Sequence, residues 1–217
     1  RTGSGKSTTI LILTRLIDLS EETKGQIMID GIDIHKIPID ALRSKIKVIP
    51  QDSYILKGSL KENIDPFKKY NDEKILRVLK KSFLLDPKFA KSSNKDIKIE
   101  IQNPDEIINP NSNIGNEFPV WANEVLNYEI EENGSNLSIG EKQLICIARA
   151  LLEVPKILLM DEATSNIDQF TDFKIQEVIK TEFKDTTIIT IAHRLNTIIQ
   201  YDKIMVMSEG EIVEMNT

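Results

Sequence analysis

RTGSGKST, residues 1–8, decides the fold, because it matches the phosphate-binding pattern GxxxxGKS/T without its first glycine. We expect that glycine to precede the chain, which then begins inside its own loop. Gly3 and Gly5 allow the backbone to turn its N–H groups inward around phosphate oxygens, at a helix start whose dipole favours anions. In such loops the lysine, here Lys6, bridges the β- and γ-phosphates, and the Ser7 hydroxyl holds Mg²⁺.

A second motif favours this interpretation over a glycine-rich turn that only happens to precede a helix. ILLMDE, residues 157–162, is an apolar strand that delivers adjacent carboxylates at its C-terminal end, where α/β sheets bind their ligands. Asp161 suits the Mg²⁺ shell, and Glu162 suits a base that polarises the attacking water. Alone, these carboxylates would more often be solvated charges at a strand end. The apolar run before them and the loop upstream make catalysis the better interpretation.

Another predicted strand, residues 187–192, is followed by a histidine. From a neighbouring position in the sheet, His193 would reach the γ-phosphate or the attacking water. A lone histidine at a strand end is usually structural. Its catalytic role therefore depends on the family resemblance given below.

Composition and charge limit the class of protein. A chain of 217 residues with 40% apolar and 29% charged residues is ordinary for a folded domain with one sizeable core. The formal net charge of -6 opposes binding to nucleic acid. No stretch approaches the roughly 18 apolar residues of a membrane span, so any membrane connection is expected through a partner or through sequence outside this chain. Cys146, the single cysteine, is expected to be a small buried apolar residue.

Apolar periodicity predicts alternating helices and strands. The predicted helices span residues 7–17, 39–44, 59–64, 72–83, 138–153, 168–183 and 195–201. The predicted strands span residues 46–49, 157–161, 187–192 and 203–207, with a hairpin over residues 26–34 around Asp30 and Gly31. On the helix 72–83 the expected core face consists of Ile75, Leu76, Leu79 and Phe83. This alternation predicts an α/β fold with a mainly parallel sheet, in which the strand 46–49 is a candidate central strand.

With these motifs in place, the chain resembles the ATP-binding cassette (ABC) family over essentially its whole length. NLSIGEKQ, residues 136–143, resembles the family signature LSGGQ, and residues 49–52 resemble the Q-loop. Residues 165–168 resemble the D-loop, and IAHRL, residues 191–195, matches the H-loop. The motifs occur in the family's order, which makes the combination specific although no single motif is.

The resemblance implies an ATPase that uses Mg²⁺ and works as one of two cassettes closed head to tail. Each ATP would then lie between the phosphate loop of one cassette and the signature of the other, where Ser138 and the Gly140 backbone would donate to the γ-phosphate. Asp168 would be the D-loop carboxylate. The residues implied for ATP binding are Thr2, Gly3, Ser4, Gly5, Lys6, Ser7, Thr8 and Gln51; those for Mg²⁺ are Ser7, Gln51 and Asp161; those for catalysis are Glu162, His193 and Lys6.

Finer features resemble the second cassette of multidrug-resistance-associated (C-type) transporters. They lie in residues 33–67 and 132–144. This likeness implies the cytoplasmic face of an integral membrane exporter, in which ATP hydrolysis moves attached transmembrane domains and the second cassette belongs to the same polypeptide. The aromatic residue that stacks on adenine in this family is expected upstream of the chain.

Pattern and resemblance together predict two parts. A P-loop NTPase core of RecA-like type is expected in residues 1–64 and 153–217, with its first strands preceding the chain. A helical subdomain is expected in residues 65–152. Within it, residues 87–119 are rich in Asn, Ser, Lys and Pro, and predict a flexible insertion. Both ends of the chain are expected to be cut.

The signature departs from the family pattern at Ile139, where the family has glycine, and at Glu141, where it has glutamine. The added bulk and negative charge beside a phosphate-facing helix start lead to the hypothesis that the site receiving this signature is weak or non-hydrolytic. The site that holds Lys6 and Glu162 would then hydrolyse ATP.

Alternative functions remain open at this stage. A soluble ABC ATPase of the chromosome-maintenance or translation type would share these motifs, but the acidic charge and the exporter-like residues around the Q-loop oppose it. A regulatory cassette that binds ATP and gates a channel with little hydrolysis is the other alternative. The presence of both Glu162 and His193 favours an enzyme.

Overall fold

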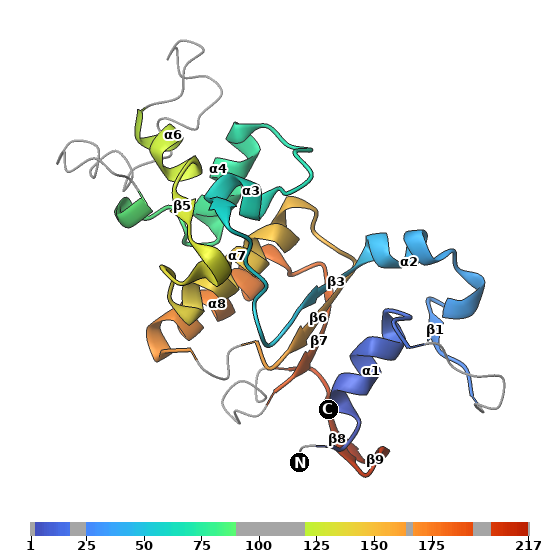
Figure 1. Ribbon diagram of the computed structural model, residues 1–217. Coiled ribbons are helices and arrows are strands. Elements are labelled where there is room, and N and C mark those ends of the chain that lie inside the picture. The colour runs from blue at the N-terminus through green and yellow to red at the C-terminus, as the bar shows by residue number, and fades with distance from the viewer. Residues whose placement is uncertain (1–2, 18–24, 90–119, 164–166, 193–200, 217) are drawn as a thin grey trace. The chain divides into compact units, whose positions relative to one another are not determined.

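A computed structural model describes residues 3–17, 25–89, 120–163, 167–192 and 201–216 (Figure 1). The chain divides into two compact units. The core unit holds the described residues of 1–51, 155–165 and 185–217, and the helical unit holds those of 52–154 and 166–184. Compared with the boundaries expected from sequence, residues 52–64 and 167–184 group with the helices, because helices in both segments pack on the helix 139–152.

The core unit is built on a parallel three-stranded sheet (Figure 1). Its strands, in spatial order, are β3 (Ile46–Ile49), β6 (Ile157–Asp161) and β7 (Thr187–Ile191). All three were predicted, but β6 rather than β3 lies in the middle. The reason is burial: Leu158 and Leu159 of β6 are fully buried, whereas Val48 of β3 and Ile189 of β7 are both partly exposed.

Helix α1 (Lys6–Leu13) packs on β6 and contributes to the main core cluster. That cluster contains Ile10, Ile34, Leu42, Ile46, Leu159 and Ile191. The helix ends before the predicted residue 17, because Arg15 adopts a left-handed φ of 50° and its N–H donates to the Ile12 carbonyl at 2.9 Å. Arg43 of α2 (Ile39–Lys45) binds the carbonyls that follow the helix. Arg43 donates from Nε to the Thr14 oxygen at 3.1 Å and from Nη2 to the Arg15 oxygen at 3.0 Å.

Within the described ranges, the core unit also contains two antiparallel hairpins. The predicted hairpin is present as β1 (Met28–Ile29) and β2 (Ile32–Asp33), and its turn residues Asp30 and Gly31 have φ of 50° and 77°, as a type I′ turn requires. The second hairpin joins β8 (Ile204–Ser208) to β9 (Glu211–Asn216). A short 3₁₀ turn, η1 (Ile34–Lys36), follows the first hairpin.

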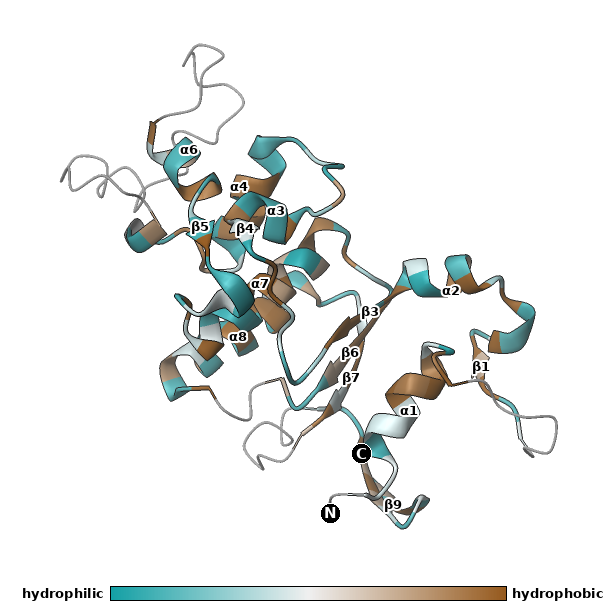
Figure 2. Cartoon of the chain, in the orientation of Figure 1, coloured by the Kyte–Doolittle hydropathy of each residue, from teal (hydrophilic) through white to brown (hydrophobic). Residues whose placement is uncertain are grey.

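The helical unit surrounds α7 (Ile139–Leu152), most of whose residues are buried. Helices α3 (Leu60–Ile64), α4 (Asp72–Lys81) and α8 (Gln169–Glu182) pack against it, and α6 (Val120–Leu126) packs on α3 and α4. The short strands β4 (Gly58–Ser59) and β5 (Glu129–Ile130) pair antiparallel, and η2 (Pro87–Phe89) and η3 (Glu132–Gly134) are 3₁₀ turns. Figure 2 shows both apolar and polar segments on these helices, as packed amphipathic helices require. Within the described ranges, no helix has the length and apolar character that a membrane crossing requires.

The predicted core face of α4 is wrong at its last member. The helix ends at Lys81, and Phe83 adopts a left-handed φ of 55° that leaves its side chain 39% exposed. Leu84, only 1% exposed, takes the buried place instead. The Ser82 hydroxyl contributes to this ending, since it donates back to the Val78 carbonyl at 2.9 Å.

The segment predicted as an insertion begins with ordered structure. Residues 87–89 form η2, and Phe89 is buried with its ring edge-on to Tyr128, at 4.8 Å between ring centroids. After the segment, α6 begins at Val120 and buries Trp121. Residues 90–119, the rest of the predicted insertion, and the predicted helix 195–201 up to residue 200 lie outside the described residues.

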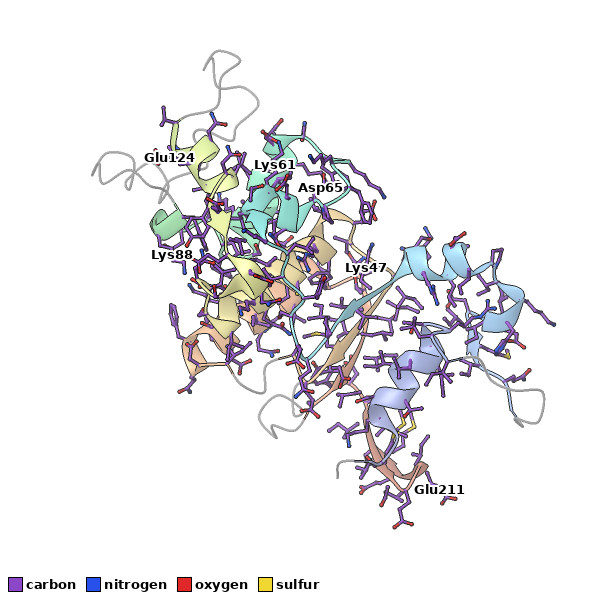
Figure 3. The ribbon with its side chains drawn as sticks, in the orientation of Figure 1. Lys47, Lys61, Asp65, Lys88, Glu124 and Glu211 are labelled. Atoms are coloured by element: carbon purple, nitrogen blue, oxygen red, sulfur yellow. The ribbon has the colours of Figure 1, made fainter. Side chains whose placement is uncertain are left out.

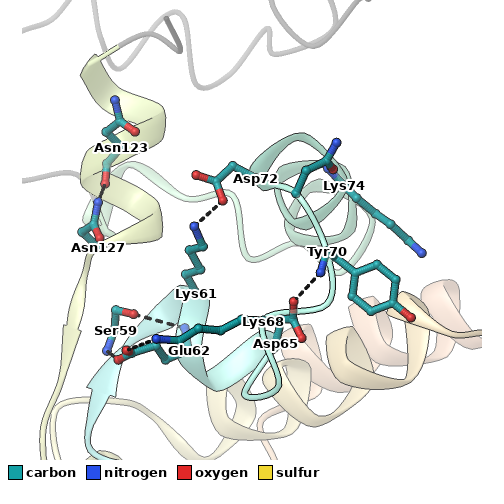
Figure 4. Close-up of polar contacts among 11 residues, drawn as sticks. Ser59, Lys61, Glu62, Asp65, Lys68, Tyr70, Asp72, Lys74, Asn123 and Asn127 are labelled. Atoms are coloured by element: carbon teal, nitrogen blue, oxygen red, sulfur yellow. Dashed lines mark hydrogen bonds and ion pairs between the residues drawn. The ribbon is translucent and has the colours of Figure 1, made fainter.

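Charged and polar side chains fix the start of α3 and its neighbours, among them Lys61 and Asp65 (Figure 3). Ser59 and Glu62 form a capping box, in which the Ser59 N–H donates to Glu62 Oε2 at 3.1 Å and the Glu62 N–H donates to Ser59 Oγ at 3.1 Å (Figure 4). Lys61 pairs with Asp72, and Asp65 accepts from the Tyr70 N–H at 2.7 Å. These bonds tie α3 to the start of α4.

Asn63 and Arg149 form the main polar contact inside the helical unit. Asn63 is fully buried; its side chain accepts from the Leu56 N–H at 2.9 Å and donates to the Leu56 oxygen at 2.9 Å. Arg149 of α7 donates to the Asn63 oxygen at 2.6 Å and to the Tyr54 oxygen at 2.7 Å. One arginine thus holds the backbone of residues 54–63 against α7.

We expect Arg149→Met to lower the free energy of unfolding by about 2–3 kcal/mol, because it leaves the carbonyls of Tyr54 and Asn63 without their donor. Denaturant unfolding of the protein would measure the loss. The matched control is Arg77→Met, which breaks only an exposed pair with Glu73 within α4 and should cost less than about 1 kcal/mol. Equal losses in the two variants would contradict the role given to Arg149.

Acid should destabilise the helix caps. The backbone hydrogen bond from Ser59 lowers the pKa of Glu62 below its ordinary 4.5, and that from Thr171 lowers the pKa of Asp168 below its ordinary 3.8. Because both folded pKa values are depressed, this stabilisation is complete above the ordinary values and is lost as the pH falls through the folded ones. Thermal unfolding across that acid range should show a shallower decline for Glu62→Gln combined with Asp168→Asn than for the unmodified protein. An unchanged pH dependence would exclude the caps as its source.

Candidate functional site

The candidate phosphate loop has a backbone that glycine permits. Gly3 has φ of 81° and Gly5, the N-cap of α1, has φ of 90°. Both angles lie in the left-handed region, where an L-residue costs roughly 1–2 kcal/mol. The loop therefore enters α1 with its N–H groups at the positive end of the helix dipole.

Two side chains of the loop, Lys6 and Ser4, contact each other, and the turn between β8 and β9 supports the loop. Lys6 donates from Nζ to Ser4 Oγ at 2.7 Å, and Ser4 is buried. The Gly210 N–H, in the turn between β8 and β9, donates to the Ser4 carbonyl at 3.3 Å. Thr8 is exposed on α1, while the Thr9 hydroxyl donates to the Gly5 carbonyl at 3.1 Å. The predicted lysine thus lies over its own loop.

The structure brings together two of the predicted Mg²⁺ ligands. Ser7 donates from Oγ to Asp161 Oδ1 at 3.4 Å, although the residues lie in α1 and β6. A hydroxyl and a carboxylate are the hard oxygen ligands that Mg²⁺ takes, usually with phosphate oxygens and water. This donor set fits the ion. Among the described residues, no group of three or more His, Cys, Asp and Glu side chains could hold a metal by itself.

Glu162 follows β6 in a strained backbone conformation. Its φ is 46°, and its N–H donates to the Ile191 carbonyl at 3.0 Å, which ties the end of β6 to the end of β7. Non-glycine residues in this region cost of order 1–3 kcal/mol and concentrate at functional sites. The parallel register pairs Asp161 with Ile191 and Ile49 with Met160. Gln51, exposed just beyond β3, therefore lies toward the same edge of the sheet as the carboxylates.

Two predicted site residues lie outside the described residues. Thr2 precedes the described part of the loop, and His193 comes two residues after the end of β7. Their roles stay predictions.

A pocket of about 350 Å³ opens beside α1 in the core unit. Its lining includes Lys6, Thr9, Ile10, residues 188–192, Tyr201, Lys203, Ile204, Met205, Met207 and Met215. Tyr201 donates from its hydroxyl to Thr190 Oγ1 at 2.7 Å, and burial raises the pKa of this tyrosine. Because the lining is mostly apolar, this pocket is a poor match for a triphosphate.

The signature residues occupy the start of α7 in the helical unit. Ser138 is the N-cap and forms a capping box with Glu141: the Glu141 N–H donates to Ser138 Oγ at 3.2 Å, and the Ser138 N–H donates to Glu141 Oε2 at 2.8 Å. Ser138 Oγ accepts this bond, and a hydroxyl that accepts one bond can also donate its own hydrogen to an incoming acceptor. Ile139, the first departure from the family pattern, is 59% exposed and fills no space in the core.

The second departure, Glu141, carries a paired charge. Its Oε1 lies in contact with Lys88 Nζ of η2. Burial works to raise the pKa of Glu141, but hydrogen bonds and charge from Lys88 and Ser138 outweigh it, so the pKa is lowered. The sequence rule S-x-x-E identifies the capping box, whereas nothing in the sequence pairs Lys88 with Glu141.

Gly140 is needed for packing between α7 and α8. A Cβ built on it would lie 2.5 Å from Thr171 Cγ2. Thr171 is held in turn by the predicted D-loop residue, because its N–H donates to Oδ1 of Asp168, the N-cap of α8, at 3.0 Å. The signature and Asp168 are thus parts of one packed pair of helix starts.

Comparisons with known proteins agree with these motifs. The family described as ABC transporter matches residues 1–165. Bile pigment transporter 1 of Saccharomyces cerevisiae is 42% identical over 217 residues, which is 100% of this chain and 13% of that protein. The metal resistance protein YCF1 of the same yeast is 42% identical over 217 residues, which is 100% of this chain and 12% of that protein.

A solved structure is similar over the whole chain. It is a bacterial Atm1-family ABC exporter with ATP bound, with a TM-score of 0.75 and 29% sequence identity, covering 100% of this chain and 32% of that one. This likeness confirms the predicted P-loop NTPase fold. The chain spans only 12% to 13% of the curated relatives named above.

We expect Gly140→Ala to destabilise the helical unit by about 1–3 kcal/mol, since the new methyl group would overlap the Thr171 side chain. Thermal unfolding of the protein would measure the loss. Adding Thr171→Ser, which removes the Cγ2 atom, should recover part of it. An unchanged midpoint in Gly140→Ala, or no recovery in the double variant, would contradict the packing argument.

Proposed function

Because the chain belongs to the ABC transporter family, we propose that it is a cassette that binds and hydrolyses ATP to drive a membrane exporter. The observation that best supports hydrolysis is the meeting of Ser7 with Asp161 at 3.4 Å, with Glu162 directly following. A phosphate loop, a pair of oxygen ligands and a general base then lie in one unit of the fold. This is the constellation that phosphoryl transfer to water needs.

The residues of the loop would bind the phosphates. Gly3, Gly5 and the start of α1 would direct backbone N–H groups at the phosphate oxygens, and Lys6 would exchange its bond to Ser4 for the β- and γ-phosphates. Ser7, Asp161 and Gln51 would hold Mg²⁺, which supplies charge neutralisation on the phosphate oxygens when bound. Thr2, Ser4 and Thr8 would complete the loop's contacts with ATP.

Glu162 would orient and polarise the water that attacks the γ-phosphate in line with the leaving oxygen. Its strained backbone and the bond from its N–H to the Ile191 carbonyl hold the start of its side chain in one place. Lys6 would offset the charge that spreads over the transferring group, and His193 would stabilise the same group from beyond β7. The products are ADP and phosphate.

The signature would act on ATP held by a second cassette. Ser138 and the Gly140 backbone, at the start of α7, would donate to the γ-phosphate in that paired site, and Asp168 would contribute as the D-loop residue. We place the second cassette in the same polypeptide and the chain on the cytoplasmic face of a membrane. Support comes from relatives named as a bile pigment transporter and an oligomycin resistance ATP-dependent permease, of which this chain covers only 13% and 14%.

Coupling to transport would follow from differential affinity. A closed pair of cassettes that binds ATP more tightly than ADP reopens after hydrolysis, and each cycle moves the attached transmembrane domains. By analogy with the family, Gln51 would relay the nucleotide state to the transmembrane domains. It is the last residue of its segment of the core unit, and the helical unit begins at Asp52. Cargo would be selected by the transmembrane domains.

The test is ATP hydrolysis by the full-length parent protein in membranes. Glu162→Gln and Lys6→Ala should each reduce Mg²⁺-dependent turnover by at least about 100-fold, because they remove the base and the phosphate cation. Glu177→Gln, at an exposed position on α8, is the matched control and should leave turnover unchanged. Turnover that persists in both site variants would show that this cassette is regulatory or that the second cassette does the hydrolysis.

A further inference from the structure

Glu141 is a carboxylate in the first turn of the signature helix, and its two oxygens have separate partners. One oxygen, Oε2, accepts the Ser138 N–H at 2.8 Å and so closes the capping box. The other, Oε1, contacts the ammonium group of Lys88, which comes from η2, far away in sequence. The negative charge of Glu141, where the family pattern has glutamine, is therefore fixed by the Ser138 N–H and paired with the Lys88 ammonium group.

Lys88, labelled in Figure 3, is held in place by its neighbours in sequence. Its N–H donates to Asp86 Oδ1 at 2.9 Å, and the next residue, Phe89, is buried with its ring against Tyr128. The Lys88 ammonium also lies 4.9 Å from the centre of the Phe89 ring. Because these contacts already restrict Lys88, pairing with Glu141 costs less conformational entropy than it would for an unrestrained lysine.

The Lys88 and Glu141 pair is more protected than an ordinary surface pair. The Glu141 side chain is only 21% exposed and that of Lys88 is 40% exposed. Lys142, next in sequence to Glu141, uses its ammonium group elsewhere, since it donates to the Asn133 carbonyl at 2.8 Å. An unmatched carboxylate at this half-buried position would lie at the helix start to which the γ-phosphate of ATP is expected to bind.

We propose that Lys88 is a positioning residue for ATP at the signature. By neutralising Glu141 and keeping its carboxylate on the Ser138 N–H, Lys88 leaves the Ser138 hydroxyl hydrogen and the start of α7 to the γ-phosphate on the paired cassette. This inference rests on the proposed function. It also revises the hypothesis that Glu141 weakens the paired site, because the structure matches the added negative charge with a positive one.

The test is a double-mutant cycle in the full-length protein, read as kcat and KM for MgATP. Lys88→Met should raise KM about three- to tenfold with a smaller change in kcat, because it exposes the γ-phosphate to the Glu141 charge. In a Glu141→Gln background, where the amide still caps Ser138 without a charge, the same Lys88→Met change should leave KM unchanged. Lys88→Arg should behave like the unmodified protein.

The matched control is Lys81→Met, which breaks another lysine–glutamate pair of the helical unit, with Glu182 at 2.6 Å. It should not change KM. An unchanged KM in Lys88→Met, or an equal rise with and without Glu141→Gln, would overturn the inference, since a purely structural lysine acts regardless of that charge. Lys6→Ala measured in parallel separates the two proposals: if it does not reduce turnover, the proposed ATPase function itself is wrong.

Discussion

The parallel pairing of β6 with β3 on one side and β7 on the other is the constraint on which the candidate site depends. Parallel strands end at the same edge of a sheet, so the register that sets Asp161 beside Ile191 also fixes where Gln51, Glu162 and the chain after β7 emerge. The phosphate loop meets this edge because α1 packs on β6, which brings Ser7 to Asp161. A hydrophobic core therefore determines the geometry of a polar site.

The helical unit carries the signature at the start of α7. There, Ser138 and Ile139 are exposed, while most of the rest of the helix is buried. Packing at Gly140 and Thr171 keeps the starts of α7 and α8 in contact, and the bonds of Arg149 hold the segment of residues 54–63 against the same helix. The local charge at the signature therefore depends mainly on the Glu141 carboxylate and on the Lys88 ammonium group that pairs with it.

Much of the core unit could be predicted from sequence, because its signals are local. The loop glycines, the apolar run that ends in Asp161, and the turn at Asp30 and Gly31 each specify structure within a few residues. The misses depend on distant contacts or on single backbone angles. Helix α1 stops early because Arg15 adopts a positive φ, and Phe83 leaves the core because its own φ is positive. Lys88 could not be identified from the sequence, because its contact with Glu141 joins residues that lie far apart in the chain and no sequence pattern predicts it.

The backbone conformation at Glu162 is one that stability alone would not favour for a glutamate. A φ of 46° is one that glycine adopts freely and glutamate does not, so the most stable residue for this turn has no side chain at all. The glutamate at this position therefore carries a backbone cost that glycine would avoid. A change to glycine at this position would relieve the backbone and at the same time remove the carboxylate that we propose to polarise water.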